Sequence, residues 1–247
     1  MPVNDKTRSG KVFLSAEWRQ LVFLNYIVDR ALLKGYVPRG TELDSFEGKT
    51  YVSLVGFRFF NTCLFGRIAV PFHSEFEEVN LRFYVRREIG SEVRRGVVFI
   101  KEIVPKLAIA LVARLAYGEN YVWYPMKHKV LTEKEDIEAE YSWKQAGNWS
   151  KLFARSARAA ELPAQNSLER YITEHYWGYS RRNAGNTQEY KVTHSPWPVS
   201  VASDALFTGN VGKLYGEDLG AVLSRKPDSA CIANGSSVEV YAGAEIQ

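Results

Sequence analysis

Cysteine is scarce in this sequence, and glycine and proline are not enriched. The 247 residues include two cysteines, Cys63 and Cys231, together with 18 glycines and 9 prolines. Two cysteines cannot form a disulfide framework, so we expect free, buried thiols and a reducing compartment. The glycine and proline counts exclude collagen-like and low-complexity chains, and an aromatic content of 13% excludes intrinsic disorder.

Long apolar runs and a strong charge of one sign are also missing. The N-terminal stretch MPVNDKTRSGKVF has no apolar core of signal-peptide length, and the most apolar helix-like stretch, Leu107 to Ala116, is short and contains Arg114. The 32 basic residues exceed the 28 acidic ones by only four, and the two signs are interleaved. We therefore expect a soluble, cytoplasmic protein with neither a membrane nor a nucleic acid as its partner.

What is present suits a globular chain with a large core. A chain of this length buries roughly 70–75% of its unfolded surface, so it needs neither disulfides nor a metal to fold. No internal repeat or low-complexity segment interrupts it. We predict a single domain over residues 1–247.

Alternating apolar and polar residues, rich in β-branched and aromatic types, dominate the chain and predict mainly strands. The predicted strands are Glu17 to Val28, Thr50 to Phe60, Phe76 to Arg86, Gly96 to Ile103, Ile137 to Trp143, Glu189 to His194, Pro198 to Ala202 and Ser237 to Ala242.

Helical patterns are fewer. They cover Asp29 to Lys34, Pro105 to Tyr117, and Ser167 to Thr173, where Ser167 is placed as an N-cap. The combination predicts an α+β fold, mainly β, in which a large antiparallel sheet carries a few packed helices.

The clearest strand pattern runs from Glu78 to Val85 and separates two rows of side chains. One row is apolar (Val79, Leu81, Phe83, Val85) and the other is polar (Glu78, Asn80, Arg82, Tyr84). An ordinary half-buried sheet, the more frequent arrangement, would turn the polar row to water. In a barrel or cone that holds a ligand, the same row would line the cavity.

Motifs for metals and cofactors are missing. None of the four histidines stands in a metal-ligand spacing, and the chain has no nucleophile elbow, phosphate-binding glycine loop or dinucleotide fingerprint. We therefore expect no metal and no cofactor. His73, His175 and His194 each lie beside aromatic residues and could converge in space, although structural histidines are more common than catalytic ones.

Lys106 is the residue with the most unusual expected surroundings. Pro105 suits the first position of a helix, which would place Lys106 in a first turn where unpaired N–H groups disfavour a cation. Apolar neighbours would lower the pKa of the ammonium further if it pointed inward. A neutral amine can attack a ketone to form a Schiff base, whereas a lysine that bends back to solvent would have no such role.

Several segments give the chain a resemblance to the YqjF-like family of uncharacterised bacterial proteins. The resemblance covers nearly the whole chain and is carried by AEWRQLVFLNYIVDRALLKGYVPRGTELD, YVSLVGFRFFNT, VPFHSEFEEVNLRFYVRR, RGVVFIKEIVPKLAIALVARLAYGENY, YITEHYWGYSRRN and YKVTHSPWPV. It implies a fold related to acetoacetate decarboxylase, with strands curled into a cone-like closed sheet around a pocket, but no established activity.

A more distant likeness to acetoacetate decarboxylase assigns roles to three residues. Arg19 matches an arginine that would hold a substrate carboxylate, Glu78 matches an acid/base glutamate, and Lys106 matches the Schiff-base lysine that directly follows a proline. Two departures stand out. Leu107 replaces the family's second lysine, and no acidic residue lies between Thr50 and Phe57, where the family has a second glutamate.

Three functions follow from these residues. The first is a Schiff-base enzyme of lyase type (decarboxylase, dehydratase or aldolase) acting on a small keto acid through Lys106. The second is a non-catalytic protein that binds a small carbonyl or carboxylate compound in the same pocket. The third is an oligomeric interaction module, as expected for homo-oligomeric decarboxylase relatives, whose cavity is filled by Phe57, Phe59, Phe83 and Phe99. The expected ligand-binding residues are Asn80, Arg82, Tyr84, His73, His175 and Tyr176.

Overall fold

The structure, a computed structural model, describes residues 10–66, 68–69, 74–106, 120–182, 185–209 and 211–246. Strands make up most of it. They are β1 (Val12–Val28), β2 (Glu42–Leu43), β3 (Thr50–Leu64), β4 (Ile68–Ala69), β5 (Phe76–Ile89), β6 (Glu92–Val104), β7 (Tyr121–Trp123), β8 (Met126–Glu133), β9 (Asp136–Gln145), β10 (Asn148–Ser156), β11 (Trp177–Arg181), β12 (Thr187–His194), β13 (Val199–Val201), β14 (Asp204–Thr208), β15 (Ser229–Tyr241) and β16 (Ala244–Ile246).

The helices among the described residues are short. They are α1 (Arg30–Leu33), the 3₁₀ turn η1 (Lys34–Tyr36), α3 (Leu168–Thr173), α4 (Gly212–Tyr215) and α5 (Glu217–Leu223). Asp29 caps α1 by accepting a hydrogen bond from the Ala31 N–H, and Ser167 caps α3 by accepting one from the Arg170 N–H. The N-cap predicted at Ser167 is confirmed, whereas the helix predicted from Pro105 to Tyr117 lies almost wholly outside the described residues.

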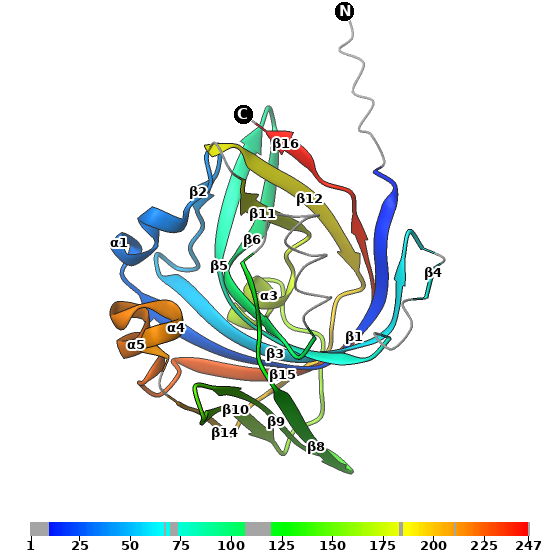
Figure 1. Cartoon of the computed structure of the whole chain (residues 1–247), viewed down its shortest axis with the longest axis vertical. Coiled ribbons are helices and arrows are strands. Elements are labelled where there is room, and N and C mark those ends of the chain that lie inside the picture. Colours follow the sequence, from blue (N-terminus) through cyan, green and yellow to red (C-terminus); the bar gives the residue numbers. More distant parts are fainter. Residues whose placement is uncertain are drawn as a thin grey trace, which may run out of the picture.

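The large sheet closes on itself. Its strands follow the order β15-β1-β3-β5-β6-β11-β12, and β12 then pairs with β15, so the described strands form a ring (Figure 1). Most pairs are antiparallel, as expected, but β6 pairs in parallel with β7 and β11, which makes the sheet mixed. The mainly β fold with a curled, cone-like sheet is therefore confirmed, and each predicted strand overlaps an observed one.

A second sheet of four strands, in the order β14-β10-β9-β8, lies against the outside of the cone (Figure 1). Gly56 of β3 allows this close packing. A Cβ atom there would lie 2.6 Å from a ring carbon of Tyr141 in β9 and 2.7 Å from a methyl carbon of Leu152 in β10. The Tyr141 hydroxyl donates to the Gln20 carbonyl of β1 at 2.8 Å, which also ties this sheet to the cone.

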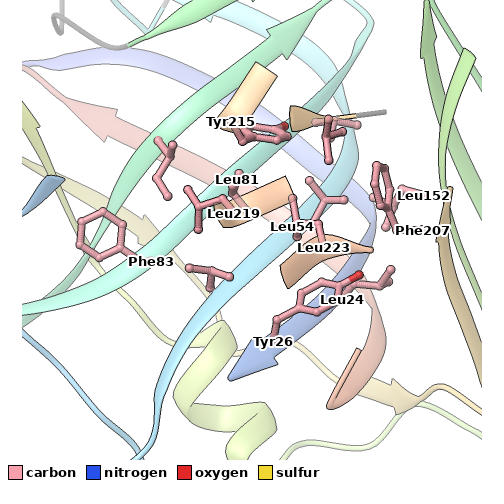
Figure 2. Close-up of a cluster of buried hydrophobic side chains, with 14 of the residues drawn as sticks. Leu24, Tyr26, Leu54, Leu81, Phe83, Leu152, Phe207, Tyr215, Leu219 and Leu223 are labelled. Carbon is pink, nitrogen blue, oxygen red and sulfur yellow. The ribbon is translucent and has the colours of Figure 1, made fainter. Parts of the chain in front are cut away.

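Helices α4 and α5 cover another part of the outer surface (Figure 2). Tyr215, Leu219 and Leu223 pack there on Leu54 of β3 and Leu81 of β5, and all of these side chains are buried. Burying one leucine or tyrosine of this kind contributes about 1.5–3 kcal/mol. A full apolar cluster therefore lies outside the cone, and the interior is left for other side chains.

Helix α3 packs at one end of the cone interior. Its buried residues Tyr171 and Ile172 join a second apolar cluster together with Phe23, Val55 and Phe57 from the inner faces of β1 and β3. The prediction that the two cysteines are free is confirmed, since Cys63 is partly buried, Cys231 is fully buried, and no disulfide joins them. No described helix has the length and apolarity needed to span a bilayer.

Candidate functional site

A cavity of about 200 Å³ occupies the interior of the cone. Aromatic side chains supply much of its wall, and they come from strands far apart in the sequence. These aromatic residues include Trp18, Phe57, Phe59, Phe76, Phe99 and Trp197. Phe59 and Phe76 stack at 4.4 Å between ring centroids, and Trp18 lies 5.3 Å from Phe57. The space is comparable to an engineered apolar cavity of about 150 Å³ that admits benzene, so a molecule slightly larger than one aromatic ring would fit.

The polar row of β5 faces inward. Glu78, Asn80 and Arg82 line the cavity, and Tyr84 is buried on the same face of the strand. The expectation that this row faces water is therefore wrong, and the cavity alternative is correct for its first three members. The physical reason is the outer cover, since α4, α5 and the second sheet bury the apolar row on the other face. Phe83 belongs to that outer row and does not fill the cavity.

Glu78 is fully enclosed and hydrogen-bonded. Asn80 Nδ2 donates to its Oε1 at 3.0 Å, and the Tyr121 hydroxyl donates to its Oε2 at 3.2 Å. Burial disfavours the carboxylate and raises the pKa of Glu78 to about 7, although the two hydrogen bonds and the charge of Arg82 act against this shift. A carboxyl group with such a pKa can release and accept a proton near neutral pH.

Arg82 lies four residues further along the same strand. Its guanidinium donates from Nη2 to the Ile172 carbonyl of α3 at 3.0 Å, and it lies 5.2 Å from the centre of the Phe23 ring. The side chain of Arg82 is about nine-tenths buried. The cavity therefore contains a cation whose charge persists at any physiological pH.

His175 and His194 both line the cavity, so two of the three histidines considered from the sequence share one space. His73 lies outside the described residues. Burial lowers the pKa of His175 well below its ordinary value, and the charges of Arg82 and Arg95 lower it further, which keeps the ring neutral. His194 stacks on Trp197 at 4.1 Å, and burial lowers its pKa as well.

Tyr84 and Tyr176, two of the expected ligand-binding residues, lie behind this wall and do not line the cavity. The Tyr84 hydroxyl is bonded to Ser53 Oγ at 2.6 Å, and its ring packs on His175 at 4.7 Å. Tyr176 packs on His194 at 5.0 Å. Both tyrosines therefore support a histidine of the cavity from behind.

Arg19 is not among the residues that line the cavity. Phe13, Leu14 and Trp18 of β1 line the cavity, and because Trp18 directly precedes Arg19, the alternation of the strand turns Arg19 to the opposite face. There its Nε donates to Glu17 Oε2 at 2.8 Å, and 40% of the side chain is exposed. A β-bulge at Gln20, where φ is 58°, adds a residue to β1, so the next side chain that lines the cavity is Leu21.

Lys106 is partly exposed and is likewise not among the described cavity-lining residues. Its Nζ donates to the Glu75 carbonyl at 3.4 Å, just before β5 begins. It lies two residues beyond Val104, the last residue of β6. The catalytic roles of Lys106 and Arg19 stay predictions.

Trp177, which the sequence offered together with Tyr176 as part of a pocket wall, does line the cavity. Polar cavity residues that were not singled out from the sequence include Glu102, Tyr121 and Thr173. Glu102 is the most informative, because it is buried beside Asn80 in the register of β5 and β6. The pairing of Leu81 with Lys101 and of Arg82 with Phe99 leaves Ile100 as an extra residue on β6. Because of this bulge, Glu102 faces the cavity. Without it, simple alternation from the inward-facing Val97 would turn Glu102 outward.

Metal binding has no support in the described part of the chain, where no three histidine, cysteine, aspartate or glutamate side chains lie close enough to hold an ion. Among the described residues, the polar groups that line the cavity include one buried arginine, two buried glutamates and neutral histidines, together with amide and hydroxyl groups. Such a set can bind a carboxylate at one place and exchange a proton at another.

The closed sheet and its inner cavity define an acetoacetate-decarboxylase-like fold, and comparison with solved structures agrees. The enduracididine biosynthesis enzyme MppR, solved with pyruvate, superimposes with a TM-score of 0.67 at 13% identity over 100% of this chain and 95% of that one. Acetoacetate decarboxylase from Legionella pneumophila gives 0.66 at 12% identity, covering 100% and 92% of the two chains. An acetoacetate decarboxylase-like enzyme from Sphingomonas wittichii RW1 gives 0.64 at 10% identity, covering 100% and 99%.

The chain belongs to the DUF2071 family, which is described as an uncharacterized conserved protein and whose profile matches residues 15–237. A relative in Bacillus subtilis (strain 168), the uncharacterized protein YqjF, is 25% identical over 217 residues, which are 86% of each chain. The resemblance to the YqjF-like family and to the decarboxylase fold is thereby confirmed.

Proposed function

We propose that this protein binds a small organic carbonyl or carboxylate compound inside the cone. The observation that carries the proposal is the inward polar row of β5, in which Glu78, Asn80 and Arg82 line a cavity whose other walls are largely aromatic. Small-molecule sites typically combine an apolar enclosure with a few convergent polar groups, and this interior has both. A volume of about 200 Å³ limits the compound to about the size of one ring or a short chain.

A panel of small carboxylic and keto acids, screened by ligand-observed NMR, tests this function. We expect at least one acid to show saturation transfer from the protein. Val55→Phe should abolish this transfer, because Val55 lines the cavity and a phenyl ring would occupy the space. Val93→Phe is the matched control, since Val93 is 54% exposed on β6. Transfer that is absent throughout the panel, or that survives in Val55→Phe, would contradict the proposal.

A second candidate function is a Schiff-base enzyme of lyase type, with Lys106 as the amine and Glu78 as the proton carrier. Two observations favour it: the shared fold with acetoacetate-decarboxylase-like enzymes, and the position of Lys106 shortly after β6, the strand whose Glu102 lines the cavity. Lys106 Nζ would add to the carbonyl carbon of a keto acid, and loss of water would leave an iminium ion. The pKa of Glu78, about 7, suits the proton transfers that follow.

Reduction with borohydride separates the two functions. A hydride adds to the iminium carbon and leaves a secondary amine, so the protein gains the mass of the keto acid less one oxygen atom. If the enzyme hypothesis holds, pyruvate gives this adduct, and acetoacetate gives it either intact or, after decarboxylation, lighter by one carbon dioxide. Lys106→Ala abolishes the adduct, and Lys101→Ala does not. Lys101 is a demanding control, because burial lowers its pKa while its Nζ donates to the Leu214 carbonyl on the outside of the cone. No adduct, or one that survives in Lys106→Ala, leaves binding without catalysis.

A further inference from the structure

The cavity has an acidic part and a basic part. Glu78 and Glu102 lie on neighbouring strands, with Asn80 directly opposite Glu102 in the register of β5 and β6. Arg82 is four residues from Glu78 along β5, which separates their Cα atoms by about 13 Å in an extended strand. Phe99, an apolar residue, faces Arg82 in the register. Among the described residues, no carboxylate of the cavity lies at ion-pair distance from the Arg82 guanidinium, although the charge of Arg82 does lower the pKa of Glu78.

Arg82 is a buried cation that no described carboxylate contacts at ion-pair distance. No ion pair among the described residues includes it. Its Nη2 donates to the Ile172 carbonyl at 3.0 Å, and its guanidinium also donates to the Tyr84 hydroxyl. Its Nε is buried and finds no acceptor in the described part of the chain. A guanidinium has five N–H donors, and a buried charge is costly unless an opposite charge or several acceptors compensate it. The unused donors thus call for an acceptor that is not part of the described protein.

His175 is a second polar side chain of the cavity whose hydrogen-bonding capacity is not satisfied by the described residues. It is 8% exposed, lines the cavity, and is held between Tyr84 at 4.7 Å and Tyr171 at 5.4 Å. Neither of its ring nitrogens has a partner of good hydrogen-bond geometry among the described residues. A neutral imidazole offers one donor and one acceptor, and packing against two tyrosines fixes the orientation of this ring. His175 can therefore donate to an anion that Arg82 attracts.

We infer that Arg82, assisted by His175, binds the carboxylate of a small monocarboxylate whose flat apolar body lies against Phe57, Phe59 and Phe99. This inference rests on the proposed function and specifies its ligand class. A carboxylate accepts two parallel hydrogen bonds from a guanidinium, and these are among the strongest polar contacts in proteins. In this inference Arg82 binds the substrate carboxylate, a role that the sequence assigned to Arg19. Arg19 is paired with Glu17 on the other face of β1.

Benzoate and its neutral counterpart benzamide provide the test, because they differ in charge but hardly in shape. Calorimetric titration of the full chain should show that benzoate binds at least tenfold more tightly than benzamide. Arg82→Lys, which keeps the charge but loses the planar fork, should weaken benzoate binding roughly tenfold. Arg82→Gln should bring the two affinities together, and Arg19→Gln should change neither.

A readout in the unaltered protein covers the case in which an Arg82 variant fails to fold. Benzoate should raise the pKa of His175, followed by NMR of its ring carbons, because a bound anion offsets the charge of Arg82. Benzamide should not. Equal affinity for the two compounds, loss of the preference in Arg19→Gln, or an unmoved pKa of His175 would overturn the inference and leave the pocket function intact. Binding of neither compound would contradict the proposed function as well.

Discussion

Strand β5 buries its polar face as well as its apolar face, whereas a strand of a half-buried sheet turns its polar face to water. The inner row holds Glu78, Asn80 and Arg82, and the outer row holds Val79, Leu81 and Phe83, yet both rows are buried. The outer row is covered by α4 and α5 and packs as an ordinary hydrophobic core, whereas the inner row faces a cavity of about 200 Å³. The comparison indicates that the outer face stabilises the fold and that the inner face is available for a ligand.

The largest expected effect on stability belongs to the outer row. Leu81→Ala leaves a hole beneath Leu219, since Leu81 is fully buried, and should cost about 2–5 kcal/mol of unfolding free energy. The same substitution at Leu131, which is 46% exposed on β8, is the matched control and should cost well under 1 kcal/mol by analogy with other surface changes. Urea denaturation measures both. Equal losses would show that the outer face is not the core described above.

A pH-dependent effect of similar size belongs to the inner row. The folded-state pKa of Glu78 is raised from 4.5 to about 7, so the folded chain holds a proton that the unfolded chain releases between these values. Stability should therefore fall as pH rises from about 4.5 to 7, by at most roughly 3 kcal/mol from this group. Glu78→Gln should remove this slope, and its stability relative to that of the unaltered protein should be highest above pH 7. A slope that Glu78→Gln leaves unchanged would contradict the assignment.

The contact between the cone and the second sheet should be sensitive to a single methyl group. Gly56→Ala would place a Cβ atom against Tyr141 and Leu152, and overpacking of this kind costs about 1–3 kcal/mol. Gly35→Ala is the control, because a Cβ at Gly35 meets nothing within 4 Å and the backbone there is helical. Thermal unfolding of the two variants compares them. If Gly56→Ala were as stable as Gly35→Ala, the second sheet would not pack as closely as described.

The smallest effect is expected at Arg19. Its ion pair with Glu17 is partly exposed, and such pairs contribute about 0.2–1 kcal/mol. Arg19→Ala should therefore shift the urea midpoint only slightly. It should leave the affinity for small acids unchanged, in contrast to substitutions at Arg82. A large loss of affinity in Arg19→Ala would show that the outward position of this side chain does not describe the working protein.

Much of the fold could be predicted from the periodicity of the sequence. The residues of the site could be predicted less completely, because two β-bulges interrupt the alternation. The strand between Glu78 and Val85 alternates without interruption, and its inward members are those that one parity predicts. At Gln20 and Ile100, an extra residue reverses the parity, which leaves Arg19 outside and brings Glu102 inside. No residue type in the sequence marks either position, because bulges are determined by pairing between distant strands.

The elements missed in the sequence have a different physical explanation. Helices α4 and α5 are four and seven residues long, which is too short for a helical period to stand out. The edge strand β8 has an exposed face with several charged residues, and none of its apolar residues is fully buried. These elements are stabilised by packing on the apolar outer face of the cone, and this packing exists only in the tertiary structure. Local sequence signals alone do not reveal it.

The claim that the cone interior binds a small carboxylate is tested most directly by a crystal structure of the protein with 4-bromobenzoate, in which anomalous scattering locates the bromine. The account predicts a bromine inside the cone, among the aromatic rings that include Phe57 and Phe99, with the carboxylate on the Arg82 guanidinium. A cavity without bromine at saturating ligand, or a carboxylate that lies on Arg19 and not on Arg82, would contradict it.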